Sequence, residues 1–186
     1  MPRRTTVPSA QEVTPLPVRL MVYEYRQDDP KKCTAARLRK FGMAESLRNI
    51  RGMPNSSIVL NPVGETRISK EDNRSVVKHG IVGLDCSWNK SEGIFLQHIP
   101  GVARRLPALL AGNPTNYAIL GRLSTAEALA AALFITGFAV QAERILALFK
   151  WGPTFMALNR EPLEAYAESP ASNLESVESE FFNLNQ

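Results

Sequence analysis

The run that most constrains the fold is Gly80-Ile81-Val82-Gly83-Leu84-Asp85-Cys86-Ser87-Trp88. Its apolar and small residues, Ile81–Cys86, predict a short strand buried on both faces, as in the interior of a parallel sheet. Open α/β sheets bind ligands at the carboxyl ends of their strands, where Asp85, Ser87 and Trp88 follow. These residues are therefore site candidates. A purely structural alternative stays open, in which Trp88 caps the core and Asp85 caps a following helix.

Strands and helices alternate on both sides of this run. Ser69 and Asp72 have the spacing of a capping box, Thr34 is placed to cap a helix, and Gly42 is placed to end it. The expected strands are Arg19–Tyr25, Ser57–Pro62, a very short Thr66–Ile68, Ile81–Cys86 and Arg104–Pro107. The expected helices are Ala35–Phe41, a short Ala44–Asn49, Ser69–Lys78 and Ser91–His98. This alternation is typical of a parallel α/β sheet.

After Pro107 the pattern changes to an all-helical one. Helices are expected over Ser124–Phe138, Val140–Lys150 and Pro153–Ala167, with a last short helix starting at Ser169-Pro170. The fold class is therefore α/β, with a mostly parallel sheet and flanking helices followed by a helical C-terminal half. We divide the chain into a proline-rich flexible lead-in (1–18), an α/β domain (19–107) and a helical domain (108–186).

Length and cysteine usage bound the class of protein. A chain of 186 residues forms one large domain or two small ones and can bury a proper core. Its two cysteines, Cys33 and Cys86, and its two histidines, His79 and His98, form no zinc-binding pattern. Reduced, buried thiols in a cytoplasmic protein are favoured over a disulfide. The longest apolar run, Ala128–Val140, is too short to span a bilayer, and no signal peptide is found.

The charge is divided unevenly along the chain. Up to Pro107 there are 18 lysines and arginines against 10 acidic residues, whereas the remainder has 4 against 8. The first part thus carries +8 and the second −4, which makes the overall +4. A basic half suggests an anionic partner that meets one face of the molecule. A solvated basic surface without a partner is the alternative.

Four loops are expected to converge on one edge of the sheet: 29–34, 60–62, 85–88 and 113–117. Loops that meet above a sheet edge favour a small-molecule pocket. Thr34 stands at a helix start, where free N–H groups favour a carboxylate or phosphate, although a plain capping threonine explains it equally. The dinucleotide-binding, Walker, nucleophile-elbow and H-E-x-x-H signatures do not occur.

Six short motifs then make the pattern specific. In chain order they are Asp28-Asp29-Pro30-Lys31-Lys32-Cys33-Thr34, Leu60-Asn61-Pro62, Asp85-Cys86-Ser87-Trp88, Arg104-Arg105-Leu106-Pro107, Asn113-Pro114-Thr115-Asn116-Tyr117 and Phe149-Lys150-Trp151-Gly152. Together they resemble the small-subunit rRNA aminocarboxypropyltransferases, ribosome-biogenesis enzymes of archaea and eukaryotes. The resemblance spans about Leu20 to Ala167, and neither the lead-in nor the tail after Ser169 takes part in it.

The resemblance implies an activity and a fold. Enzymes of this family move the 3-amino-3-carboxypropyl group of S-adenosylmethionine to N3 of a pseudouridine derivative in small-subunit rRNA, releasing methylthioadenosine. It also implies a relation to the SPOUT class of methyltransferases, with the cofactor held in a deep trefoil knot. The expected partner is small-subunit rRNA or a pre-ribosomal particle, with no membrane and no metal. We expect a cytoplasmic protein and a monomer.

Residue roles follow from the same resemblance. Asp85 is the expected catalytic residue, taking the N3 proton or orienting the base. The expected cofactor-binding residues are Thr34 and Thr115 at the carboxylate, Leu60, Pro62 and Trp88 around the arm and sulfonium, Leu84 at the ribose, and Ala108, Leu109, Leu110 and Tyr117 at the adenine. An indole beside a sulfonium is also a favourable cation–π arrangement.

Basic residues near these motifs are the candidates for RNA binding. They are Lys31, Lys32, Arg37, Arg39, Lys40, Arg104 and Arg105. Two alternatives to aminocarboxypropyl transfer stay open. A SPOUT-like RNA methyltransferase would differ only in which carbon of the sulfonium faces the nucleophile, and a non-catalytic rRNA-binding assembly factor would need no cofactor pocket.

Overall fold

The computed structural model describes residues 18–25, 33–88 and 93–182. Five parallel strands form one sheet in the order β2-β1-β4-β3-β5. They are β1 (Leu20–Glu24), β2 (Glu45–Leu47), β3 (Ile58–Leu60), β4 (Ile81–Asp85) and β5 (Val102–Arg104). The prediction of a parallel α/β sheet with the Gly80–Trp88 run at its centre is confirmed.

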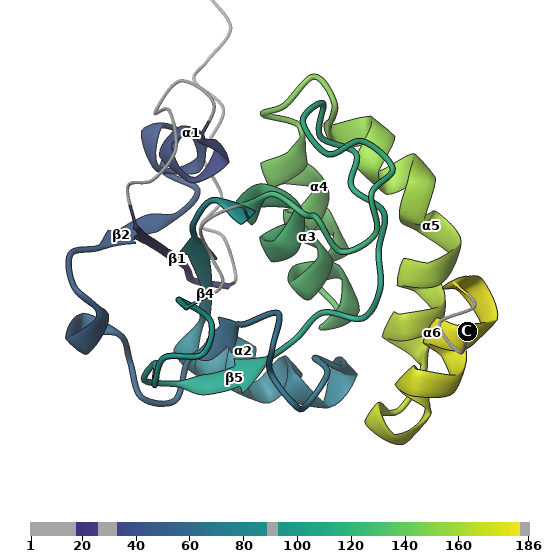
Figure 1. Ribbon diagram of the computed structural model, residues 1–186, viewed down its shortest axis with the longest axis horizontal. Helices are drawn as coiled ribbons and strands as arrows, with labels where there is room; N and C mark the ends of the chain where they lie inside the picture. The colour runs from purple at the N-terminus through teal and green to yellow at the C-terminus, as the bar shows by residue number, and fades with distance from the viewer. Residues whose placement is uncertain (1–17, 26–32, 89–92, 183–186) are drawn as a thin grey trace, which may run out of the picture.

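Six α-helices accompany the sheet within the described residues. They are α1 (Thr34–Lys40), α2 (Asn73–His79), α3 (Thr125–Ile135), α4 (Ala139–Leu146), α5 (Gly152–Glu168) and α6 (Leu174–Phe182). Figure 1 shows α3 to α6 gathered on one side of the sheet, with α6 outside α5, while α1 lies near β2 and α2 near β5, at opposite edges of the sheet. The change to an all-helical second half after Pro107 is confirmed among these residues.

The central strand requires its glycine because α3 packs directly on it. A Cβ atom at Gly83 would lie 2.9 Å from the Cγ2 atom of Thr125, at the first turn of α3. Helix α3 is rich in alanine and almost entirely buried, which allows this close approach. Its start is fixed by a capping box in which Ser124 and Glu127 bond each other's backbone N–H.

Two hydrophobic clusters cover the faces of the sheet. The larger contains residues from strands of the first half, such as Leu20 and Ile58, together with Leu129, Ile145 and Phe155 of the helical half. The smaller, on the other face, includes Met21 and Val82. Residues on both sides of Pro107 thus share one core cluster.

Several local predictions were wrong. The residues Glu45–Leu47, expected within a helix over Ala44–Asn49, form the edge strand β2, because pairing with β1 outweighs the helix propensity of Ala, Glu, Leu and Arg. Residues 93–96 of the expected helix Ser91–His98 form turns, residues 97–98 are irregular, and the remainder lies outside the described residues. Thr66–Ile68 contributes one isolated bridge, between Arg67 and Arg105.

Some ends were also displaced. The last strand is Val102–Arg104, earlier than the expected Arg104–Pro107. The helix expected from Ser69 begins with a 3-10 turn (Lys70–Asp72) before α2, although its capping box is present as expected. A similar turn (Ala171–Asn173) precedes α6, so that the last α-helix starts later than Ser169-Pro170. The expected lead-in lies outside the described residues except for Val18.

Candidate functional site

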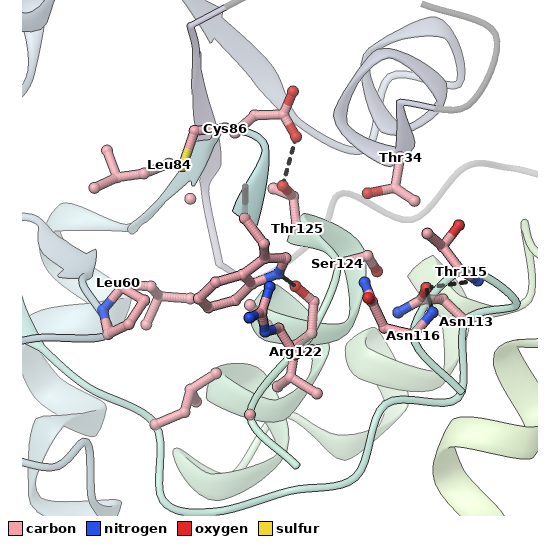
Figure 2. A pocket seen from close by; sticks show the side chains of 18 of the residues that line it. Thr34, Leu60, Leu84, Cys86, Asn113, Thr115, Asn116, Arg122, Ser124 and Thr125 are labelled. Atoms are coloured by element: carbon pink, nitrogen blue, oxygen red, sulfur yellow. Dashed lines mark hydrogen bonds between the residues drawn. The ribbon is translucent and has the colours of Figure 1, made fainter. Parts of the chain in front are cut away.

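A cavity of about 450 Å³ lies at the carboxyl ends of β3 and β4. It is bounded by the segments that follow these two strands, by the starts of α1 and α3, and by three pieces of the chain between β5 and α3 (residues 106–108, 113–116 and 121–124). Figure 2 shows side chains from both halves of the protein pointing into it. Its volume lies within the range of small-molecule sites.

One wall of the cavity is apolar. Leu60, Pro62, Leu84 and Trp88, all expected at a cofactor, lie together there. The indole N–H of Trp88 donates to the carbonyl oxygen of Leu123 at 2.9 Å, which joins this wall to the segment before α3. The aromatic ring is thereby held in place while its surface contributes to the cavity.

Arg122 is a residue of the cavity that the sequence did not single out. Its guanidinium carbon lies 5.6 Å from the centre of the Trp88 ring, a cation–π distance, and its side chain is exposed. One face of Trp88 therefore already has a cation beside it. A positively charged ligand group can use Trp88 only through the remaining ring surface or after Arg122 moves away.

The carboxylate of Asp85 is held by two neighbours. Thr125 donates its hydroxyl to Oδ1 at 2.6 Å, and Cys33 donates its thiol to Oδ2 at 3.1 Å (Figure 2 draws the Thr125 bond). The strand β4 delivers the residue, while α3 and the start of α1 supply its partners. An acceptor fixed from two sides at the cavity wall is suited to receive a proton from a bound group.

The start of α1 differs from the expectation that Thr34 is the capping residue. Cys33 is the N-cap, and its sulfur accepts the N–H of Ala36 at 3.2 Å. Thr34 is the first helical residue, and its hydroxyl oxygen accepts the N–H of Ala126 at 3.2 Å instead. Thr34 thus ties α1 to α3, and it still lines the cavity.

Cys33 is held as a neutral thiol. Burial raises its pKa to about 12; the N–H of Ala36 opposes this rise, and the nearby Asp85 carboxylate adds to it. Because the sulfur stays protonated at neutral pH, it can donate to Asp85. Cys33 and Cys86 form no disulfide within the residues that the structure describes.

The polar wall opposite is a loop built on one buried glutamate. Glu127 accepts the backbone N–H groups of Gly112 at 2.7 Å and Asn113 at 3.0 Å, and the Asn113 side-chain amide at 2.7 Å. Asn113 in turn accepts the N–H groups of Thr115 and Asn116, as Figure 2 shows. A loop without regular secondary structure thereby presents Thr115 and Asn116 to the cavity in one conformation.

A second buried glutamate fixes the segment at Ala108. Glu178, on α6, accepts the N–H of Ala108 at 2.6 Å and also pairs with Arg67. Tyr166, on α5, donates its hydroxyl to the carbonyl oxygen of Ala108 at 3.0 Å. Burial raises the pKa of Tyr166, so its hydroxyl remains a donor. Both polar groups of the Ala108 backbone are thus held by helices from the end of the chain.

The structure brings together most of the expected cofactor-binding residues. The residues that line the cavity are Thr34, Leu60, Pro62, Leu84, Trp88, Ala108 and Thr115, together with Asp85. Leu109 is buried in the core, Leu110 forms backbone bonds to Asn159, and Tyr117 is 57% exposed; these three are not among the lining residues. The roles given to all of these residues remain predictions.

The expected RNA-binding residues are spread over different surroundings. Arg37 and Lys40 line a recess beside the cavity, and Arg39 pairs with Glu24. Arg104 pairs with the buried carboxylate of Asp72 at 3.1 Å, so part of its charge is already neutralised within the protein. The remaining candidates are Arg105, which pairs through its backbone with residues 66 and 68, and Lys31 and Lys32, which lie outside the described residues.

The described residues hold neither a metal-binding group nor a membrane-spanning helix. Over the part of the chain that the structure describes, no group of three or more His, Cys, Asp or Glu side chains is arranged to hold a metal. Within the same residues, no helix has the length and apolar character needed to cross a membrane.

Comparison with known proteins identifies the family. A family model described as "Ribosome biogenesis protein, C-terminal" matches residues 58–182. A protein of Methanosarcina acetivorans named 16S rRNA aminocarboxypropyltransferase is 42% identical over 158 residues, covering 84% of this chain and 89% of that protein. The chain belongs to this family. A member from Methanopyrus kandleri is 43% identical, covering 82% of this chain and 91% of its own.

A solved structure of the family has the same fold. The SAM-dependent rRNA:acp-transferase Tsr3 from Vulcanisaeta distributa superposes with a TM-score of 0.84 at 38% identity, covering 91% of each chain. The family model extends to residue 182, so α6, which the sequence resemblance left out, belongs to the matched region. This agrees with the position of Glu178 at the cavity.

A second model, described as "Possible Fer4-like domain in RNase L inhibitor, RLI", matches residues 18–51. An iron–sulfur cluster of this type takes four cysteine ligands. Residues 18–51 contain one cysteine, Cys33, and its thiol donates a hydrogen bond to Asp85. This match therefore carries no cluster site in this chain.

Proposed function

We propose that the protein transfers the 3-amino-3-carboxypropyl group of S-adenosylmethionine to N3 of a pseudouridine in small-subunit rRNA. Family membership with aminocarboxypropyltransferases that match over four-fifths of the chain carries the proposal. The cavity supports it, because an apolar wall, a rigid polar loop and a fixed carboxylate enclose a volume of about 450 Å³. The name of the matched Vulcanisaeta enzyme states its dependence on S-adenosylmethionine.

The two walls suit the two kinds of surface that this cofactor presents. In the proposed arrangement Leu60, Pro62 and Trp88 surround the apolar part of the arm, and the backbone at Thr34 and the side chain of Thr115 receive its carboxylate. Ala108 and Leu84 contact the nucleoside. When bound, the sulfonium makes the first carbon of the arm electrophilic, so that a nitrogen can form a bond there as the carbon–sulfur bond breaks and its electron pair stays on sulfur.

Asp85 takes the proton of the attacking nitrogen in this proposal. Its carboxylate has fixed partners on both oxygens and lies at the cavity wall, so it can accept a proton without first reorganising. Choice among the three carbons on a sulfonium is a matter of orientation, and holding both reactants in place can supply about 7–11 kcal/mol of the barrier. The Glu127-supported loop and the apolar wall supply that orientation.

The decisive experiment uses S-adenosylmethionine labelled separately in the methyl and the carboxyl group, with a small-subunit rRNA fragment. We expect the carboxyl label in the RNA and methylthioadenosine as the released product. A SPOUT-like methyltransferase would instead place the methyl label in the RNA and release S-adenosylhomocysteine, and that result would refute the proposal. If the protein binds the RNA but transfers neither the methyl nor the carboxyl label to it, that result would support the non-catalytic assembly factor.

Finer expectations belong to the same proposal. We infer a SPOUT-like fold with a trefoil knot; what supports it is that the segment between β5 and α3 crosses the ends of β3 and β4 to line the cavity, after which α3 packs on β4. A crystal structure of the protein tests the knot, because its traced chain either passes through a loop formed by the chain itself or does not. We also propose a monomer, the division into domains 19–107 and 108–186, and a cytoplasmic location.

A further inference from the structure

Four planar side chains form a row beside the cavity, which we call the stacking row: Phe41, Arg37, Phe149 and Trp151. The guanidinium carbon of Arg37 lies 5.6 Å from the ring centres of both Phe41 and Phe149. Phe149 is stacked on Trp151 with 4.8 Å between ring centres and 29° between ring planes. The row thus joins the end of α1 to the turn between α4 and α5.

The stacking row leads directly to the candidate site. All four residues line the recess beside the cavity, together with Lys40. That recess shares Cys33, Thr34, Pro114, Thr115 and Trp151 with the cavity itself, so the two spaces adjoin. A chain segment lying along the row would therefore be continuous with a group bound in the cavity.

Packing within the protein does not account for the outer end of the row. Phe41 is 50% exposed although it is a large aromatic residue. Arg37 is exposed and, among the described residues, forms no ion pair with a carboxylate. Within the described residues, an exposed ring and a guanidinium without an ion-pair partner therefore lie in one row and offer a flat surface beside a positive charge.

We propose that the stacking row binds an unpaired nucleotide of the rRNA that is adjacent to the modified base. Single-stranded RNA is bound by stacking of its bases on aromatic rings and guanidinium planes, while neighbouring cations contact phosphates. The half-exposed ring of Phe41 provides the stacking surface, and Arg37 and Lys40 provide the cations. This proposal rests on the proposed rRNA substrate and narrows it to a loop or bulge in which the neighbour of the target is unpaired.

The experiment uses the full chain and short RNA hairpins in which the target lies in a loop. 2-Aminopurine, whose fluorescence falls when it stacks, replaces the nucleotide on the 5′ or the 3′ side of the target. We expect quenching at one of these two positions when the protein binds. A matched hairpin in which the same neighbour is base-paired should bind more weakly.

Variants separate stacking from charge. Phe41→Leu should weaken binding by about 5- to 100-fold and abolish the quenching, whereas Phe41→Tyr should keep both. Lys40→Gln should lower the slope of log affinity against log salt by about 0.7, and Phe41→Leu should leave that slope unchanged. Lys78→Gln, on α2, and Val140→Ala, on α4, are exposed controls that should bind like the unchanged protein.

The outcomes distinguish this proposal from the proposed function. The proposal for the stacking row would be overturned if neither 2-aminopurine position is quenched, or if the Phe41→Leu variant binds the hairpin with unchanged affinity. Either result would count against the row even if the labelled aminocarboxypropyl group is transferred to the RNA. Quenching that depends on the Phe41 ring would support the row even if no transfer occurs, and the proposed function would then fail separately. Equal binding of an acidic peptide that competes with the hairpin would show a protein-binding surface instead and would also overturn the proposal.

Discussion

The two walls of the cavity are held in place by different means. On the sheet side, Leu60, Leu84 and Asp85 stand at the ends of strands, so the hydrogen-bonded ladder fixes their positions. On the helical side, the segment between β5 and α3 belongs to no strand pair of the sheet, and the carboxylates of Glu127 and Glu178 hold its backbone. One wall is supported by backbone bonds between strands, whereas the other is held by side chains, among them Glu127 and Glu178, with Tyr166 and Asn159 adding bonds to Ala108 and Leu110.

Because of this difference, the residues that supply functional groups are not the ones that hold a wall in place. A substitution at the end of a strand removes a functional group and leaves its position intact, because the ladder does not use the side chain. A substitution of a buried glutamate leaves several N–H groups without an acceptor, and each buried unsatisfied group costs about 1–3 kcal/mol. Variants on the sheet side should therefore lose activity, and variants on the helical side should lose stability.

The largest effect is expected at Asp85. Asp85→Asn should lower turnover by about 10²–10⁴-fold with cofactor affinity retained, because the amide cannot accept the proton. Single-turnover transfer to the rRNA fragment and calorimetric binding of S-adenosylmethionine measure the two quantities. Turnover close to that of the unchanged protein would make Asp85 structural and would remove the chemical role from the sheet side.

Glu127 tests the opposite wall. Glu127→Ala should lower the free energy of unfolding by about 3–5 kcal/mol, because three backbone N–H groups and one side-chain amide lose their acceptor. Denaturant unfolding measures this change. Glu127→Gln, which retains one oxygen, should fall between, and the exposed Glu143→Ala should change stability by less than about 0.5 kcal/mol. Equal stability of all three variants would contradict the role of the Glu127 carboxylate in holding this wall.

A smaller effect is expected for the apolar wall. Trp88→Ala should weaken binding of S-adenosylmethionine by about 1–3 kcal/mol while the fold is retained. Trp88→Phe keeps a ring and loses the bond to Leu123, so it separates contact with the ligand from support of the wall. Unchanged calorimetric affinity in Trp88→Ala would place Trp88 outside the binding site.

The smallest effect is expected at the outer edge of the sheet. Arg19 and Glu45 form an exposed pair between β1 and β2, with 2.6 Å between Nη2 and Oε2. A double-mutant cycle with alanine should give a coupling of about 0.2–1 kcal/mol that decreases with added salt. If the coupling is as large as the loss of stability expected for Glu127→Ala, the exposed Glu45 contributes as much to stability as the buried Glu127, and burial does not explain the difference between the two walls.

Local patterns predicted the parts of the fold that local forces determine. The run with glycines at 80 and 83 predicted β4, and the Ser69–Asp72 pattern predicted a capping box that the structure contains. The resemblance brought together eight residues that line one cavity. What it could not supply is contact between distant segments: Glu127 to Gly112, and Glu178 to Ala108 across 70 positions.

The errors have the same cause. The helix-favouring sequence at Glu45–Leu47 forms a strand because β1 has a free edge, and Cys33 replaces Thr34 as the cap because its sulfur lies between Ala36 and Asp85. A glutamate three residues after Ser124 was a visible signal for Glu127 as a capping residue. Its second role, in holding the 112–116 loop, had no local signal.

The position of Glu178 has a consequence for protein synthesis. The sheet is complete in sequence at Arg104, but the segment at Ala108 receives a hydrogen bond from a residue 70 positions later in the chain. Because a chain is synthesised from its N-terminus, the strands are available for pairing before α6 has been made. The cavity wall at Ala108 is held by both of its helical partners only after synthesis has passed Glu178.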